Sequence, residues 1–184
     1  WTYQIGEDLF VEQNFFVPRG FSVAVLRWSL RGNGPASLKV RPFLSGRDFH
    51  ATHHENGVLN FSAEVADDRV TWSPYPGVLR VTARSNGRYS SQPDWYRNFA
   101  YSEEQARGLD FVEDLASPGA FEFDLGAGCA ELVLVAEGHE AVFSQSVDDL
   151  ARQEQDRRAA FLSKLHKAAD AYFVRRGTGK TLIA

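Results

Sequence analysis

The sequence lacks several features that would place a protein quickly in a class. It has one cysteine, Cys129, so no disulfide can form within the chain, and it contains no methionine. It has no signal-peptide pattern and no apolar run of the roughly 18 residues that a membrane-spanning helix needs, so neither a span nor secretion is indicated. Its net charge is −4 with no sustained basic run, whereas nucleic-acid binding usually needs a basic face.

These absences lead to expectations about the origin of the chain. A lone thiol within the apolar stretch around Cys129 predicts a buried, reduced cysteine and hence a cytoplasmic protein. The lack of Met even at position 1 indicates a chain that begins inside a longer gene product. What is present is ordinary for a globular protein: 184 residues, 43% hydrophobic and 24% charged, enough for one domain with a sizeable core.

Alternating apolar and polar residues predict strands in the first three quarters of the chain. Residues 21–31 form one such segment, and residues 38–41 follow it after Asn33-Gly34-Pro35, so the two are predicted to pair as a hairpin. Further strands are predicted at 78–84, 121–125 and 131–136. Short strands without intervening helices indicate a mainly β, antiparallel β-sandwich.

The C-terminal part changes to a helical period. Ser146-Val147-Asp148-Asp149 is a capping box, and apolar residues then recur at helical spacing, so one helix is predicted over 146–176. Residues 177–184 would begin a connection to a further domain. Gly177–Thr181 resembles a phosphate-binding loop, but that motif requires a glycine where Val174 stands, and a turn is the simpler interpretation.

Two groups of residues invite stronger interpretations. His50, His53, His54 and Glu55 could suggest a divalent metal, but no remote fourth ligand is evident, so we expect no metal and a polar loop with one buried, hydrogen-bonded His and two exposed ones. Residues 95–119 are rich in carboxylates. A glycosidase needs two carboxyl groups on opposite sides of the scissile bond, and residues close together in the sequence rarely provide that arrangement. We expect no catalytic residue and no cofactor, and pairing of these acids with Arg97 and Arg107. The acids are Glu103, Glu104, Asp110, Glu113 and Asp114.

Two longer stretches, 41–56 and 95–119, are dense in arginine, acidic and aromatic residues. They resemble the N-terminal domain of prokaryotic glycogen debranching enzymes, of the amylo-α-1,6-glucosidase type. The first carries the pattern RP…RDxH…EN and the second WYxNFxYxxExxRGLDxxEDLxxPGxF. The matching residues are Arg41, Pro42, Arg47, Asp48, His50, Glu55, Asn56, Trp95, Tyr96, Asn98, Phe99, Tyr101, Glu104, Arg107 to Asp110, Glu113 to Leu115, Pro118 and Gly119.

The resemblance implies a particular domain organisation. Residues 1–145 would be the N-terminal β-sandwich, of super-sandwich-like form, without its first strands, because the family's TNGLGGYASGT and TRRYHGLL stretches do not precede Trp1. The helix over 146–176 would lead into an (α/α)6 barrel, which would supply the acid and base that cleave α-1,6-linked glucose. This chain alone would then be no enzyme, its partner would be that catalytic domain of the same polypeptide, and unpaired edge strands could allow self-association.

The resemblance also implies a glucan as a possible ligand. Trp95, Tyr96 and Tyr101 would stack on sugar rings, and Arg47, Asp48, His50 and Arg97 would bond hydroxyl groups. Glu104, Arg107, Asp110 and Glu113 would form a structural loop network. The same side chains could instead fix loops and a domain interface. Two further alternatives stay open: an independent carbohydrate-binding module, and a purely structural scaffold.

Overall fold

The structure is a computed structural model that describes residues 1–48, 51–176 and 179–183. His50, a predicted sugar-binding residue, and Gly177-Thr178 of the supposed phosphate loop lie outside the described residues. The chain divides into two compact units, Trp1–Ser144 and Gln145–Ala184. Within the described part, no helix is both long and apolar enough to cross a membrane.

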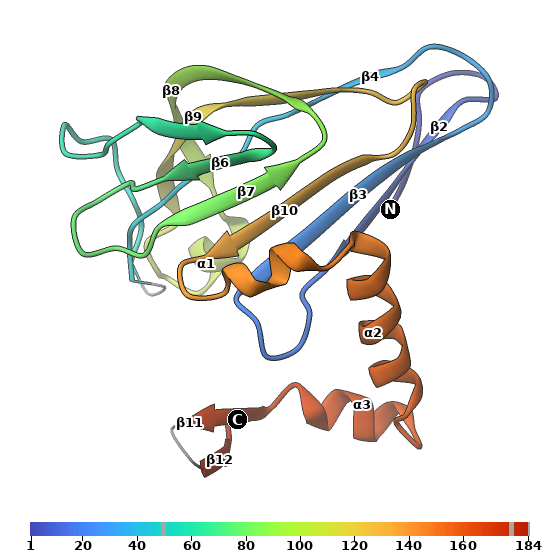
Figure 1. The fold of residues 1–184 in the computed structure, drawn as a ribbon. Helices are drawn as coiled ribbons and strands as arrows, with labels where there is room; N and C mark the ends of the chain where they lie inside the picture. The colour runs from blue at the N-terminus through green and yellow to red at the C-terminus, as the bar shows by residue number, and fades with distance from the viewer. Residues whose placement is uncertain (49–50, 177–178, 184) are drawn as a thin grey trace. The chain divides into compact units, whose positions relative to one another are not determined.

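The first unit contains a seven-stranded sheet in which every neighbouring pair is antiparallel. Its strand order is β1-β2-β3-β10-β7-β6-β5, so β10 lies between two strands that are distant from it in the sequence (Figure 1). The strands are β1 (Thr2–Gln4), β2 (Phe10–Phe16), β3 (Val23–Arg31), β5 (Ala63–Ala66), β6 (Arg69–Trp72), β7 (Val81–Ser85) and β10 (Ala130–Ala136).

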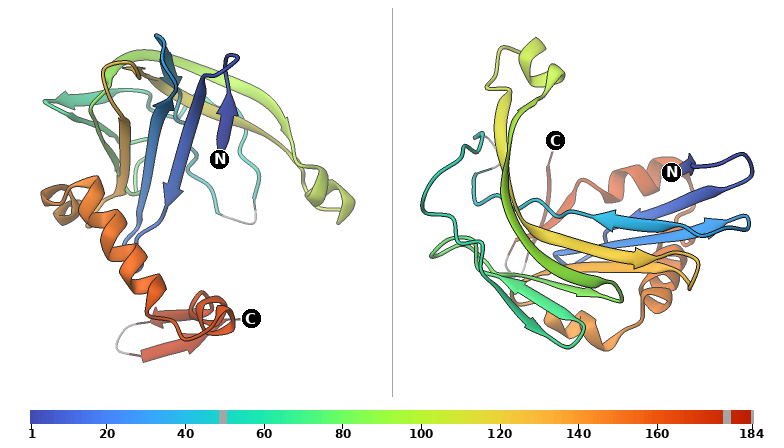
Figure 2. Two further views of the ribbon diagram at one scale, coloured as in Figure 1. Left: turned by 90° about the vertical axis from the view of Figure 1, so that its right-hand side faces the viewer. Right: turned by 90° about the horizontal axis from the view of Figure 1, so that it is seen from above.

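A second, three-stranded sheet has the order β4-β9-β8. It comprises β4 (Ser37–Val40), β8 (Arg88–Ala100) and β9 (Val112–Asp124), and a short helix, α1 (Ser102–Ala106), connects the last two. β8 and β9 form a long hairpin that curves away from the rest of this sheet, with α1 at its tip (Figure 2). The register of this hairpin shifts twice, between Ser91 and Asp94 and between Tyr96 and Phe99, and such irregularities bend a strand.

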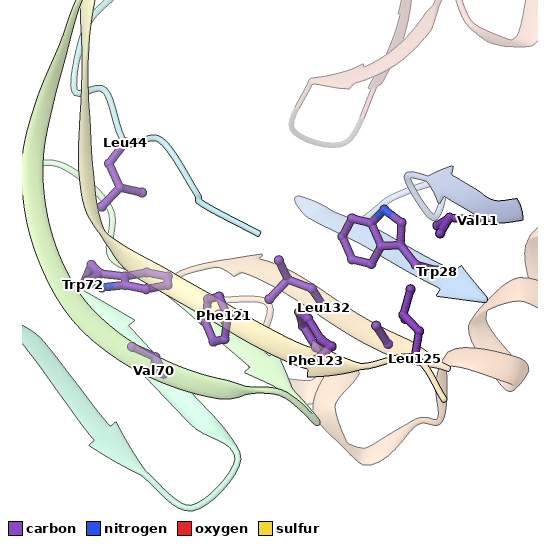
Figure 3. Packing of buried hydrophobic residues seen from close by; sticks show 11 residues of the cluster. Val11, Trp28, Leu44, Val70, Trp72, Phe121, Phe123, Leu125 and Leu132 are labelled. Carbon is purple, nitrogen blue, oxygen red and sulfur yellow. The ribbon is translucent and has the colours of Figure 1, made fainter. Parts of the chain in front are cut away.

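The core lies between the two sheets. Trp28 and Leu132 come from the large sheet, and Phe121 and Phe123 come from β9 of the small one (Figure 3). Trp72 is fully buried and meets Phe121 edge to face, with 6.2 Å between ring centroids. The alternation read from residues 121–125 therefore puts the apolar side chains inside, and the predicted antiparallel sandwich is confirmed.

The opposite face of the large sheet carries a short 3-10 helix, η1 (Glu140–Ser144). Its Val142 and Phe143 are buried, and Nη1 of Arg84 on β7 donates to the carbonyl oxygen of Phe143 at 2.7 Å. Val25 and Val133, on the same face of neighbouring strands, are also buried. β10 thus has buried apolar side chains on both faces of the sheet, such as Leu132 and Val133, which explains the nearly continuous apolar run over 131–136.

Two local predictions are wrong. The strands at 21–31 and 38–41 do not form a hairpin, because β3 pairs with β2 and β10 whereas β4 pairs with β9 in the other sheet. Cys129 is exposed and not buried, because it precedes β10 in the connection after Gly126-Ala127-Gly128. The cytoplasmic location that rested on a buried thiol stays a prediction.

The second unit begins with the predicted helix. The Ser146 hydroxyl accepts from the Asp149 amide at 3.1 Å, so the predicted cap and helix are present, but the helix does not run unbroken to residue 176. Ser163 caps a separate helix, and a hairpin follows it. The elements are α2 (Val147–Ala159), α3 (Lys164–Asp170), β11 (Phe173–Arg176) and β12 (Gly179–Leu182).

One ion network joins the two helices of this unit. The carboxylate of Glu154 accepts hydrogen bonds from Arg157 and Arg158, and Arg157 also donates to Asp170 at 2.6 Å. The hydrogen bond to Glu154 is the main cause of a raised pKa for the Arg157 guanidinium. The network supports a corner between α2 and α3, where the helical period alone suggested continuity.

Candidate functional site

The residues of the two Arg-rich and aromatic-rich stretches meet around Glu113, near the start of β9. Its side chain is 2% exposed. Nε of Arg47 donates to Oε2 at 2.8 Å and Nη2 donates to Oε1 at 3.2 Å. The backbone amide of His53 donates to Oε2 at 3.1 Å, and the Tyr101 hydroxyl donates to Oε1 at 2.5 Å. One carboxylate therefore joins the loop before β5 to the tip of the β8–β9 hairpin.

Burial and hydrogen bonding act in opposite directions on the pKa of Glu113. Burial by itself raises the carboxyl pKa, but the hydrogen bonds from Tyr101, Arg47 and the His53 amide outweigh it and leave the pKa below its ordinary value of 4.5. The hydrogen bond between Tyr101 and Glu113 also raises the pKa of the Tyr101 phenol, because ionisation would remove the donated proton. Glu113 is thus ionised and Tyr101 is neutral near pH 7.

Asp114 holds the same two segments from the next position. Its Oδ2 accepts from the amide of Glu55 at 3.0 Å, and its Oδ1 accepts from the amide of Asn98 at 3.0 Å. These two amide bonds lower the pKa of Asp114. Asn98 lies at the second register shift with a φ of 62°, a left-handed conformation that asparagine tolerates better than most residues.

His53 is the buried histidine expected within the polar loop. Its Nδ1 lies 3.1 Å from the carbonyl oxygen of Asp114, and its Nε2 lies 2.7 Å from the Tyr75 hydroxyl. Since a carbonyl only accepts, Nδ1 carries the proton and Nε2 accepts from Tyr75. His54 is exposed. Within the ranges that the structure describes, no group of three His, Cys, Asp or Glu side chains could hold a metal ion.

The predicted sugar-stacking residues lie in different environments. Trp95 is 9% exposed, and its ring packs against His53 and Phe61 at centroid distances of 5.3 and 5.9 Å. Tyr96 is half-buried and meets Phe43 edge to face at 5.1 Å, with the Arg41 guanidinium over its ring at 5.3 Å. Trp95 therefore offers little ring surface to a ligand, whereas Tyr96 lies in a partly exposed cluster.

The other predicted residues are more exposed. Arg97 pairs with Glu55 through two hydrogen bonds, with side chains 50% and 42% exposed. This pairing lowers the pKa of Glu55 and raises that of Arg97. The sequence predicts that Arg97 pairs with an acid of the second stretch. In the structure its partner is Glu55, which belongs to the first stretch.

The remaining predicted residues contact close neighbours in the sequence. At the C-terminal end of α1, Nη1 of Arg107 lies 3.7 Å from Oε1 of Glu104. Asp110 is exposed. Asp48 is also exposed, and its carbonyl oxygen accepts from Arg47 at 3.2 Å. The structure thus brings Arg47, Trp95, Arg97, Tyr101 and Glu113 together, and it leaves Asp110 and the Glu104–Arg107 pair apart from them.

Sequence reasoning missed Tyr75 and the role of Asn56. The Tyr75 hydroxyl donates to His53 and accepts from Nδ2 of Asn56 at 2.8 Å. A side chain on Gly46 would lie 2.3 Å from the Tyr75 ring, so the glycine makes room for that ring. The glycine before Arg47 was the available signal, but no local pattern connects it to a tyrosine so far along the chain.

Comparison with known proteins identifies the family. Residues 1–131 match the family model described as glycogen debranching enzyme N terminal. The match covers well over half of the chain, so the chain belongs to this family. It includes both motif stretches and ends inside β10, so the second unit lies outside it. No curated protein matched the chain.

Proposed function

We propose that this chain is the non-catalytic N-terminal domain of an enzyme that hydrolyses α-1,6-linked glucose branches, and that an (α/α)6 catalytic domain follows in the same polypeptide. The Glu113 network carries this proposal. Glycoside hydrolysis needs a carboxylic acid of raised pKa opposite a second carboxyl group. Glu113 and Asp114 instead have lowered pKa values and oxygens occupied by donors. Their chemistry fits loop anchoring better than proton transfer.

The same network suggests how the domain would help a catalytic partner. Charge-assisted hydrogen bonds from Arg47 and Tyr101 fix the tip of the hairpin before any partner arrives. A surface fixed in advance loses less conformational entropy when it binds. We propose that the β8–β9 hairpin and the adjoining loop present a rigid surface to the catalytic domain.

Contact with the glucan would be made by the reachable members of the predicted set. Tyr96, Arg97 and Asp48 are at least partly exposed, whereas Trp95 is buried. Burial of the largest predicted stacking residue favours a scaffold that borders a glucan site over an independent carbohydrate-binding module. Such a border would bind sugar weakly by itself.

Titration of the chain with maltoheptaose and with a branched limit dextrin, followed by NMR, tests this proposal. We expect no saturable binding at millimolar sugar by the chain alone. In the polypeptide that also carries the catalytic domain, Tyr96→Ala should raise KM for limit dextrin, while the matched variant Tyr89→Phe should not. Tight binding by the isolated chain would instead establish a carbohydrate-binding module.

A further inference from the structure

The chain contains three Asn-Gly pairs: Asn33-Gly34, Asn56-Gly57 and Asn86-Gly87. In such a pair the amide nitrogen of the glycine can attack the side-chain carbonyl carbon of the asparagine, because glycine has no side chain to hinder the approach and its backbone adopts many conformations. A five-membered succinimide ring forms only when the asparagine side chain and the glycine amide can move together. The folded structure therefore decides which of the three pairs can react.

The pair at Asn86 is exposed but firmly held. Nδ2 of Asn86 donates to the carbonyl oxygen of Cys129 at 2.7 Å, and its Oδ1 accepts from the Glu131 amide at 2.8 Å. The Gly87 amide, which would be the attacking group, donates to Oγ of Ser85 at 3.0 Å. Exposure alone therefore does not make an Asn-Gly pair reactive in this fold.

The side chain of Asn56 is held at both of its polar atoms. Its Oδ1 accepts from the amides of Val58 and Leu59, both at 3.1 Å, in a turn of the kind that asparagine side chains commonly close. Its Nδ2 donates to the carbonyl oxygen of His54 at 2.9 Å and to the Tyr75 hydroxyl at 2.8 Å. These bonds fix the side-chain conformation that succinimide formation would have to change.

The third pair, Asn33-Gly34, lies in the connection from β3 to β4, which crosses from the large sheet to the small one (Figure 1). Both residues are exposed. Among the residues that the structure describes, none forms a hydrogen bond with the Asn33 side chain or with the Gly34 amide. Gly32 precedes Asn33, so few side chains restrict the backbone of this segment.

We propose that the fold leaves Asn33 open to spontaneous deamidation while it protects Asn56 and Asn86. The Gly34 nitrogen forms a bond to Cγ of Asn33 and loses its proton, while the Cγ–Nδ2 bond breaks and Nδ2 leaves as ammonia. Water then opens the succinimide at either carbonyl group, which gives aspartate or isoaspartate. Both products add a negative charge to the connection between the sheets, and isoaspartate also lengthens the main chain by a methylene group.

Incubation of the folded full chain at mildly alkaline pH, followed by peptide mapping with mass spectrometry, tests the proposal. We expect Asn33 to deamidate about tenfold or more faster than Asn56 and Asn86, because those two side chains must first lose hydrogen bonds that Asn33 does not make. Asn33→Gln should prevent the change at this position, because a glutamine side chain would have to close a larger ring. A folded chain in which Asn33 reacts no faster than Asn86 overturns the proposal.

The chain unfolded in guanidinium is the matched control. All three pairs then lose their tertiary hydrogen bonds and keep the same Asn-Gly sequence, so their deamidation rates should converge. An advantage of Asn33 that is equally large in the unfolded chain overturns the proposal, because the local sequence and not the fold would then be its cause. The inference does not depend on the proposed glucan function.

Discussion

β9 passes through two regions that are stabilised in different ways. Its C-terminal half contributes Phe121 and Phe123 to an apolar core, where packing is dense and non-directional. Its N-terminal half carries Glu113 and Asp114, whose four oxygens accept hydrogen bonds or ion pairs from the neighbouring loop and hairpin. The N-terminal half of β9 thus fixes the positions of loops, and its C-terminal half fills the apolar core.

The difference shows what each region can tolerate. An apolar core accepts another side chain of similar volume, because contact area matters more than direction. A buried carboxylate accepts few replacements, because each donor around it loses its partner when the charge or geometry changes. The two regions should therefore respond differently to conservative substitution and to pH.

The largest effect is expected in the core. Phe121→Ala should lower the free energy of unfolding by about 3–5 kcal/mol, because it removes a buried ring and leaves a cavity. Phe121→Leu, which conserves the apolar character, should cost under about 1.5 kcal/mol. Guanidinium denaturation measures both, and similar losses for the two variants would contradict the volume-filling account.

The polar region should respond more sharply to a change of the same size. Glu113→Gln keeps the shape but removes the negative charge that Arg47 neutralises and to which Tyr101 donates a hydrogen bond, and should cost about 2–4 kcal/mol. Faster hydrogen exchange should appear at the Tyr101 amide, which bonds to Phe111 at the base of the tip. Glu104→Gln, at an exposed pair, should stay within about 0.5 kcal/mol of the parent. Equal effects of the two variants would show that burial of Glu113 is unimportant.

A fall in pH should destabilise the polar region around Glu113 before it affects the apolar core. The folded-state pKa of Glu113 lies below its ordinary value of 4.5, so its stabilising contribution is present above that value and is lost as pH falls through the folded pKa. The parent chain should therefore lose more stability than Glu113→Gln between neutral pH and pH values below 4.5. Parallel pH profiles for the two chains would contradict this.

The smallest change in stability is expected at the exposed ion pair of the polar region, and it can be compared with the change at the buried pair. Arg97→Ala removes the exposed pair with Glu55 and should change the melting temperature less than Arg47→Ala. Molar salt should reduce the Arg97 effect further and leave most of the Arg47 effect, because buried pairs are poorly screened. Thermal unfolding with and without salt measures both.

Much of the core was predictable because strand period is local information. The alternation over 121–125 and the apolar run over 131–136 identify β9 and β10 correctly. The pairing of strands was not predictable in the same way. β4 follows β3 closely in the sequence, yet it pairs with β9, and nothing in residues 38–41 indicates that partner.

The site shows the same limit. The motif stretches contain Arg47, Tyr101 and Glu113, and their abundance of opposite charges predicts a network. Burial, however, depends on distant partners, so the sequence leaves open whether Trp95 stacks on a sugar ring or fixes loops and a domain interface. In the structure Trp95 is buried in a cluster with Leu59, and Phe61 and Tyr75 pack against that cluster. Sequence reasoning also missed Tyr75, the hydrogen-bond partner of His53.

The position of β10 has a consequence for biosynthesis. β1 to β3 and β5 to β7 form two separate meanders, each paired only between sequence neighbours, and β10 alone joins them. A chain that emerges from the ribosome N-terminus first can form both meanders early, but the continuous sheet must wait until residues 130–136 leave the exit tunnel. Until then the facing edges of β3 and β7 stay open, so translation speed beyond β9 sets how long the nascent chain is vulnerable to aggregation.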